Sequence, residues 1–156
     1  MRNNQLSRYG SISRSIPELA PSAKVFLVSD SDDTNVGPIN LGNIYPVDED
    51  GVVRVYSTIQ AAVNACAGGR GDVVLVAPNH VENLNRADSW NVAGVQVIGM
   101  GSGEQRSGVN LDTTGSTINL GAAGVRVSNL MFTARETAIT RCLDLDTGFF
   151  GQRVDH

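Results

Sequence analysis

The 156-residue sequence predicts an all-β fold in which short strands stack as a parallel β-helix (solenoid), with one capping α-helix and an extended N-terminal arm. Three observations favour this fold. Glycine occurs 17 times, aromatic residues make up only 5 % of the chain, and short valine-rich segments recur along its second half. Glycine turns between short apolar segments are typical of strands rather than of a helical bundle. A strand recurring roughly every 20–30 residues is typical of a solenoid.

Residues 1–22 are expected to form an arm, and residues 23–156 a single β-helix domain. The arm is rich in serine and asparagine and carries Arg2, Arg8 and Arg14, but it lacks any sustained apolar periodicity. Segments of this kind are often disordered alone and become ordered on a partner. A flexible tail without a partner is the alternative.

The domain begins with two short strand candidates, at residues 24–28 (KVFLV) and 52–56 (VVRVY), separated by polar and irregular sequence. A short helix is predicted at about 58–67. Ser57 and Gln60 have the spacing of a capping box, in which each side chain satisfies a free backbone donor at the helix start. The residues at helical spacing on one face are apolar, namely Ile59, Ala62, Val63 and Cys66. Gly68 and Gly69 then end the helix.

The repeat begins directly after this helix. Four strands are predicted, at residues 73–76, 95–98, 125–127 and 143–145, with shorter pieces between them at 109–111 and 117–120. A β-sandwich would also contain several short strands with glycine turns. The helix at 58–67 favours the β-helix, because a short amphipathic helix can cover the unpaired backbone and apolar core at the first coil.

The stretch STIQAAVNAC…GDVVLVAPNHVENL resembles the opening of right-handed parallel β-helix proteins of the pectin-lyase-like class. In that class a similar helix caps the first coil and a similar strand follows it. GVQVIGMGSG and GVRVSNLMF resemble the next coils, and KVFLVSDSDD resembles the strand that usually precedes the helix. The resemblance covers about residues 24–146 and implies right-handed coils. Its motifs are architectural and imply no catalytic residue.

The composition limits the classes of partner. The net charge of −4 gives no general attraction for nucleic acid or for an anionic membrane. No apolar run approaches the roughly 18 residues that a spanning helix needs. The N-terminus, MRNNQLSRYGSISRSI, lacks the apolar core of a secretion signal, so no classical export is expected. No cofactor and no metal site are expected, because Cys66, Cys142, His80 and His156 show no ligand spacing.

Several motifs could indicate a binding or reactive site, but each has a simpler structural interpretation. Gly99-Met100-Gly101-Ser102-Gly103 follows a strand, yet no apolar helix follows it, so a tight turn is favoured over a nucleotide loop. The acidic segments at 30–33 and 48–50 are interpreted as solvated turns. Cys66 and Cys142 are interpreted as two buried free thiols, with a disulfide as the alternative. His80 lies in a predicted turn and is expected to be exposed.

Polysaccharide cleavage is the activity that such a fold most often suggests. Asp144 and Asp146 alternate along one predicted strand, so both would lie on the same face and could form a carboxylate pair, while Leu143 and Leu145 point inside. Solvated outward aspartates are the alternative. Trp90 is the only tryptophan and could be a sugar-stacking platform, an interface anchor, or a residue packed within its own long turn.

A stack of only three or four coils is marginal unless both of its ends are covered. No second cap is evident at the C-terminal end, where Phe149 and Phe150 are expected to meet a neighbouring subunit or a further part of a longer polypeptide. Such a short stack also offers little room for a catalytic groove. These features favour a non-enzymatic structural protein.

The arm joined to such a module resembles virion proteins of tailed bacteriophages, both tail spikes and capsid-surface proteins. The resemblance implies a capsid decoration or projecting head or tail protein, made in the host cytoplasm and located in the virion. It would dock through its arm on major capsid or tail subunits and form a homo-oligomer, a trimer by family analogy. The alternative is a carbohydrate-active or carbohydrate-binding module of a tail-spike depolymerase, using Asp144, Asp146 and Trp90. The residues expected to bind partners are Arg2, Arg8, Arg14, Trp90, Phe149 and Phe150.

Overall fold

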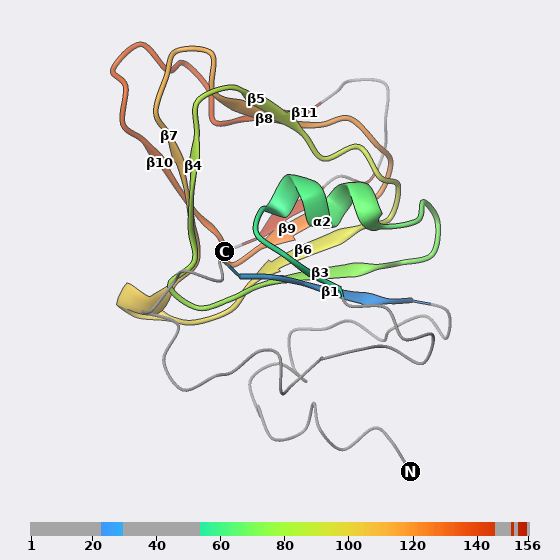
Figure 1. Cartoon of the computed structure of the whole chain (residues 1–156). Helices are drawn as coiled ribbons and strands as arrows, with labels where there is room; N and C mark the ends of the chain where they lie inside the picture. Colours follow the sequence, from blue (N-terminus) through green and yellow to red (C-terminus); the bar gives the residue numbers. More distant parts are fainter. Residues whose placement is uncertain (1–22, 30–53, 146–150, 152, 156) are drawn as a thin grey trace.

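The computed structural model describes residues 23–29, 54–145, 151 and 153–155. In this part of the chain, short strands stack in three parallel sheets around one apolar interior (Figure 1). The elements in chain order are β1 (Val25–Val28), β2 (Val55–Tyr56), α2 (Ile59–Ala65), β3 (Val73–Val76), β4 (Val81–Leu84), β5 (Ala87–Ser89), β6 (Gln96–Gly99), η2 (Gly103–Gln105), β7 (Gly108–Leu111), β8 (Thr117–Leu120), β9 (Arg126–Ser128), β10 (Met131–Ala134), β11 (Leu143–Leu145) and β12 (Arg153–Asp155).

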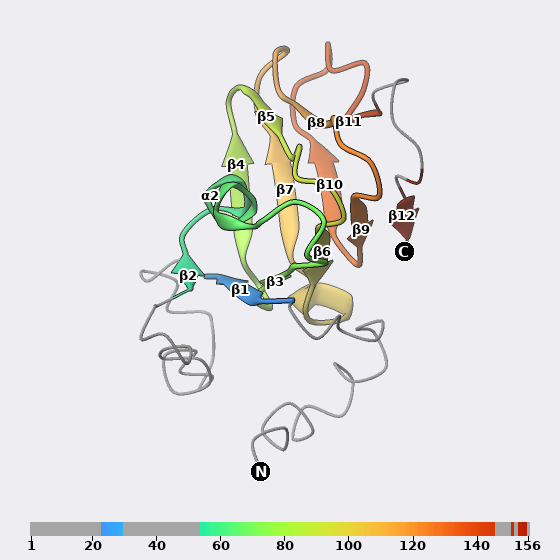
Figure 2. The same ribbon diagram turned by 90° about the vertical axis from the view of Figure 1, so that its right-hand side faces the viewer.

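The strands wind from sheet to sheet in a fixed order, so the fold is a parallel β-solenoid, as the sequence predicts. Sheet A has the order β12-β9-β6-β3-β1-β2, sheet B the order β10-β7-β4, and sheet C the order β11-β8-β5. Three successive coils, β3-β4-β5, β6-β7-β8 and β9-β10-β11, each contribute one strand to each sheet, and their strands pair in parallel with the equivalents in the neighbouring coils (Figure 2). The strands β1, β2 and β12 extend sheet A alone. The two facing antiparallel layers of a β-sandwich do not occur among the described residues.

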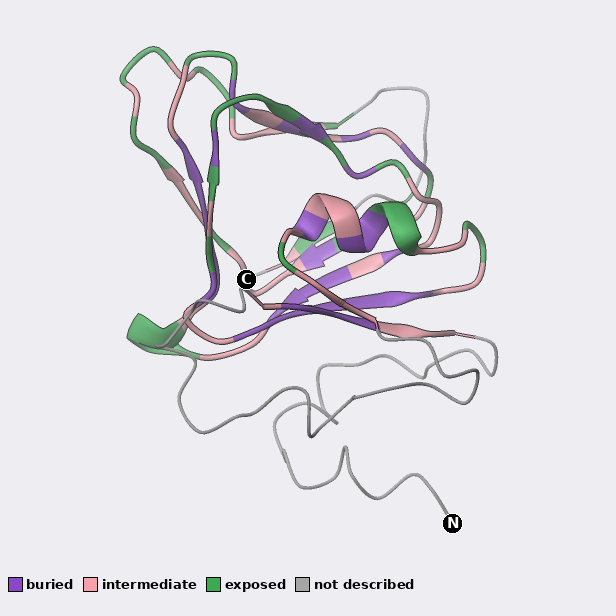
Figure 3. Ribbon diagram, in the orientation of Figure 1, coloured by how far each residue is buried: buried purple, intermediate pink, exposed green. Residues whose placement is uncertain are grey.

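The interior is built from in-register stacks of apolar side chains. In sheet A, Phe26, Val74, Val97, Val127 and Val154 occupy equivalent positions of successive strands. The first four are at most 2 % exposed, whereas Val154 on the last strand is 42 % exposed. Although the coils differ in length, in-register parallel pairing places equivalent positions of successive strands above one another. Branched side chains pack well on such a surface. Buried residues occur on α2 and on strands of all three sheets (Figure 3).

A second buried cluster lies on the other face of sheet A. It contains Leu27, Val73, Leu75, Ala77 and Ile98. The strands β1 and β3 are therefore buried on both faces, which explains why their sequences, VFLV and VVLV, are continuously apolar rather than alternating.

A stacked glycine precedes each sheet A strand from β6 onward. Gly94, Gly124 and Gly151 have φ values of 74°, 71° and 82°, in the left-handed region that favours glycine. Gly94 donates its N–H to the carbonyl of Ala123 in the next coil at 2.9 Å. A Cβ on Gly124 would lie 3.7 Å from the Cα of Gly94, so these turns lie directly above one another.

The helix α2 is shorter than predicted and has a different cap. It ends at Ala65, and its N-cap is Thr58, whose hydroxyl accepts a hydrogen bond from the Ala61 N–H at 3.2 Å. The predicted capping box of Ser57 and Gln60 is therefore wrong. The predicted apolar face is confirmed, since Ile59, Ala62 and Val63 are fully buried against the interior.

The repeat also needs one correction. The segment 143–145 forms a strand, but it is β11 of sheet C, equivalent to β8, and not the fourth member of the series in sheet A. That member is β12, which pairs with β9. The strands β4, β5 and β10 were not predicted, because their sequences VENL, ADS and MFTA are too polar or too short to carry a clear alternation.

The close approach of two coils at Gly99 provides a test of this stacking. A Cβ at Gly99 would lie 2.2 Å from the backbone oxygen of Asn129 in the next coil, whereas a Cβ at Gly115 would meet nothing within 4 Å. We expect G99A to lower the free energy of unfolding by about 1–3 kcal/mol, the cost typical of an overpacked site. G115A is the matched control and is expected to change it by less than about 0.5 kcal/mol. Urea unfolding measures both, and equal midpoints for the two variants would contradict the stacking.

Candidate functional site at the ends of the coil stack

Many of the residues predicted to bind partners lie outside the described residues. The arm arginines, the C-terminal phenylalanines and one of the two candidate carboxylates belong to this group, namely Arg2, Arg8, Arg14, Phe149, Phe150 and Asp146. Their predicted roles stay predictions. The acidic segments at 30–33 and 48–50 also lie outside the described part.

Trp90 lies in the interior. Its side chain is 1 % exposed and belongs to the main apolar cluster, and its backbone N–H donates to the Asn119 carbonyl at 2.8 Å. A ring in this position offers no face to a sugar or to another subunit. Of the three interpretations of Trp90, the structure supports packing within the fold and corrects its assignment as a surface anchor.

Asp144 lies on the outer face of β11 and is paired. Its Oδ1 accepts a hydrogen bond from the Arg141 guanidinium at 3.0 Å, in a largely exposed ion pair. The register places Leu143 and Leu145 beside the buried Ile118 and Leu120, so both point inside as predicted. Leu145 is nevertheless 49 % exposed, because no described strand follows it in sheet C.

His80 and the cysteines differ from their predicted surroundings. His80 was expected to be exposed but is 3 % exposed, so that prediction is wrong. Cys66 and Cys142 are both free thiols, and both are half-buried rather than fully buried. Burial, together with the negative charge of Asp72, raises the pKa of Cys66 to about 12, so this thiol is protonated at neutral pH.

The glycine-rich segment after β6 forms the predicted tight turn. The Asn129 side-chain amide donates to the carbonyls of Gly99 and Gly101, at 2.8 Å and 3.0 Å. Ser107 anchors the other side of the turn through bonds from its hydroxyl to the carbonyls of Val76, Ala77 and Met100. Only the three-residue η2 follows the glycines, so the geometry of a phosphate-binding helix is missing here.

The N-terminal end of the stack is closed by α2, and Gln60 makes the most informative contact there. Its amide nitrogen donates to the Ser89 carbonyl at 2.8 Å, and its amide oxygen accepts from the Ser89 N–H at 2.7 Å. Ser89 belongs to β5, the outermost strand of sheet C at this end. A side-chain amide carries the same donor and acceptor as a peptide group, so Gln60 takes the place of a missing neighbouring strand.

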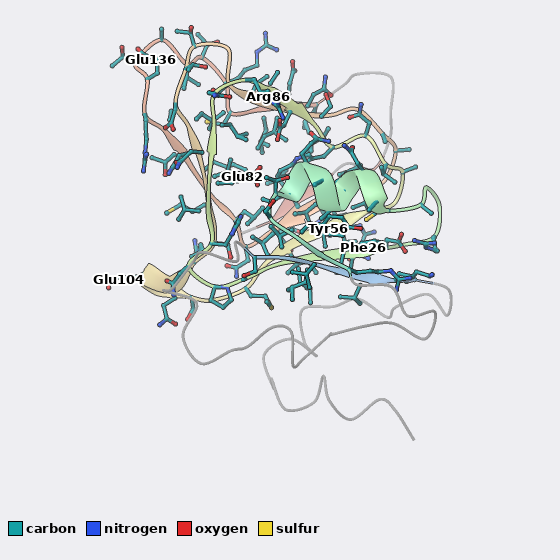
Figure 4. All side chains as sticks on the ribbon, in the orientation of Figure 1. Phe26, Tyr56, Glu82, Arg86, Glu104 and Glu136 are labelled. Carbon is teal, nitrogen blue, oxygen red and sulfur yellow. The ribbon has the colours of Figure 1, made fainter. Side chains whose placement is uncertain are left out.

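Glu82 on β4 supports the same helix from sheet B. Its Oε2 accepts a hydrogen bond from the Ile59 N–H at 2.9 Å, at the positive end of the helix (Figure 4). The pKa of Glu82 is raised to about 7, mainly by burial and also by the charge of nearby Asp88, while the Ile59 N–H and Arg86 act in the opposite direction. Burial likewise raises the pKa of Asp88, which Arg86 opposes.

Asp72 joins the end of the helical segment to the first strands. Its carboxylate accepts hydrogen bonds from the Lys24 N–H and the Ala67 N–H, both at 2.8 Å, and it forms an ion pair with Arg70. Burial alone would raise the pKa of this fully buried carboxyl, but these hydrogen bonds hold it below its usual value. Asp72 therefore stays ionised and ties the turn after α2 to Lys24, which lies 48 residues away in the sequence.

The C-terminal end of the described stack is open. The strands β10, β11 and β12 are the outermost strands of sheets B, C and A (Figure 2). Leu145 and Val154 continue the inner stacks below them, yet they are 49 % and 42 % exposed. The inner apolar surface and three strand edges therefore meet at this end, which makes it the strongest candidate for a contact surface.

Two other kinds of feature are absent from the described part of the chain. No group of three or more His, Cys, Asp or Glu side chains there could hold a metal ion. No helix among these residues is both long and apolar enough to cross a membrane. Comparisons of the chain with protein-family models, with curated proteins and with solved structures each found no match.

The buried carboxyl of Glu82 predicts an unusual dependence of stability on pH. Its pKa is about 7 in the folded chain and near the ordinary value of 4.5 in the unfolded chain, so the folded state holds the proton more tightly. The resulting stabilisation is complete below about pH 4.5 and is lost as the pH rises through 7. We expect the contribution of this group to the free energy of unfolding to fall by roughly 3 kcal/mol between pH 4.5 and 8.

Two variants isolate this effect in thermal unfolding measured across that pH range. E82Q keeps an acceptor for the Ile59 N–H but cannot ionise, so its unfolding free energy is expected to vary less with pH and to exceed that of the wild type at pH 8. E104Q, which removes an exposed carboxyl on η2, is the control and is expected to follow the wild type. A pH profile of E82Q identical to that of the wild type would contradict the assignment.

Proposed function

We propose that this protein is a non-enzymatic structural module of a larger assembly, and specifically a virion structural protein of a tailed bacteriophage. The observation that carries the proposal is the open end of the stack, where the inward-facing Leu145 and Val154 are left half exposed on the outermost strands. Apolar surface beside unpaired strand edges is costly in an isolated protein and useful in a subunit that is covered by a neighbour.

The rest of the fold supports a mechanical role. Neighbouring coils pair their backbone groups in parallel, and apolar side chains, many of them valines, form one interior cluster. Such a block is stiff and presents few irregular segments to proteases. We expect its coils to be right-handed, as strand-to-strand crossovers in parallel sheets almost always are.

The arm is the second contact in this proposal. Residues 1–22 would lie along neighbouring major capsid or tail subunits, with Arg2, Arg8 and Arg14 pairing with carboxylates or carbonyls of those subunits. The module would act as a decoration protein or as a projecting part of a head or tail, in a homo-oligomer within the particle.

The carbohydrate-active alternative has less support from the described residues. It relies on Trp90 as a stacking platform and on Asp144 as one of two carboxylates. Trp90 is buried and Asp144 is paired with Arg141, so neither is free to meet a sugar in the described arrangement.

Removal of the arm tests the proposed docking. We expect deletion of residues 2–16 to abolish incorporation into phage particles, measured by mass spectrometry of purified particles, because the arm supplies the contacts with neighbouring subunits. Circular dichroism and thermal unfolding of the purified variant should match those of the full chain. The triple variant R2S/R8S/R14S keeps the length of the arm and is expected to be incorporated at a reduced level. Normal incorporation of the deletion variant would contradict the proposal.

A further inference from the structure

In β12, the last strand of sheet A, the backbone hydrogen-bonding groups point alternately toward β9 and toward the open edge of the sheet. Arg153 donates its N–H to the Val125 carbonyl at 3.0 Å, and the Asp155 carbonyl accepts from the Asn129 N–H at 3.2 Å. Both residues therefore direct their backbone groups toward β9. Backbone groups of successive residues in a strand point to opposite sides, so the N–H and C=O of Val154 face the open edge.

Two β12 strands that run antiparallel to each other have complementary charges at opposite positions. An antiparallel pair of β12 strands centred on Val154 places Val154 opposite the partner's Val154, with both N–H···O bonds exchanged between them. The same alignment places Arg153 opposite the partner's Asp155, and Asp155 opposite the partner's Arg153. These flanking positions are non-hydrogen-bonded pairs, in which opposite side chains approach most closely.

The side chains of β12 also fall on the correct faces for this pairing. Val154 is in register with the buried Val127 and so lies on the inner face, where it would continue the apolar stack into the second copy. Arg153 and Asp155 lie on the outer face, where they form an exposed ion pair with each other at 2.8 Å. In the pair of strands, each of these charges gains a second partner of opposite sign.

The two ends of the stack differ, and this difference bears on the symmetry of a contact between two copies of the chain. At the N-terminal end, α2 lies over the first coil and Gln60 already occupies both backbone groups of Ser89 on β5. Ser89 therefore has no free backbone group for the open end of a second copy, which disfavours head-to-tail stacking along sheet C. Open end against open end is a closed twofold contact, in which β12 meets an identical β12.

We propose that two copies of this chain bind end to end through antiparallel pairing of their β12 strands about a twofold axis at Val154. The pairing joins the two copies of sheet A into one continuous sheet and covers Leu145 and Val154 of both copies. This inference deepens the proposed function, and it rests on that function only in treating the open end as a contact between subunits.

Charge reversal with complementation tests the pairing in sedimentation equilibrium of the full chain. The wild type is expected to be a dimer at micromolar concentration. R153D leaves β12 with two carboxylates and D155R leaves it with two guanidiniums, so each variant alone faces like charges across the axis. Each is expected to raise the dissociation constant of the dimer by about tenfold or more. An equimolar mixture of the two variants restores opposite charges at both positions and is expected to form a heterodimer of near wild-type affinity.

The control is R126D, which reverses an exposed charge at the equivalent position of β9, one coil away from the edge. It is expected to leave the dimer unchanged. If circular dichroism shows that a reversed charge unfolds β12, the neutral variants R153Q and D155N replace them, each with an expected severalfold weakening. A monomeric or trimeric wild type, full dimerisation of R153D or D155R alone, or no recovery in the mixture would overturn the inference. The arm deletion is instead measured by incorporation into phage particles. Failure of the proposed virion function is therefore distinguishable from failure of the proposed dimer.

Discussion

Hydrogen bonds between successive coils hold this structure together, and every coil depends on a neighbour on each side. A stack of coils therefore leaves unpaired backbone groups and uncovered apolar side chains wherever it stops. At one end the chain supplies the missing neighbour itself, through α2, with Gln60 replacing a strand beside Ser89 and Glu82 accepting the Ile59 N–H. At the other end, β10, β11 and β12 are the outermost strands described. This difference between the two ends connects the fold to its proposed use.

The sequence predicted those elements that a short run of neighbouring residues is enough to identify. The strands β1, β3 and β6 contain short runs of apolar, β-branched residues that locate them, and the alternating valines of GVRV locate β9. The helical spacing of Ile59, Ala62 and Val63 likewise predicted which face of α2 is buried, and the structure confirms it. The parallel order of the strands followed from their recurrence between glycine turns.

The contacts that close the first coil could not be read from the sequence, because their partners are far apart in it. Gln60 reaches Ser89 and Glu82 reaches Ile59, and no local pattern reports either contact. The buried positions of Trp90 and His80 depend in the same way on the coils that surround them. One missed signal was available: AGVRV at 123–127 and the glycine and valine of FGQRV at 150–154 share a spacing that would have identified β12 in place of 143–145.

Amide hydrogen exchange, measured residue by residue on dilute protein, tests most directly whether one end of the stack is closed and the other open. The account predicts that the Ser89 amide, bonded to the Gln60 side chain, exchanges slowly although it lies on an outermost strand. It predicts that the Val154 amide, which faces the open edge, exchanges quickly and becomes slow as the protein concentration rises. Fast exchange at Ser89, or equal protection at Ser89 and Val154 in dilute protein, would contradict it.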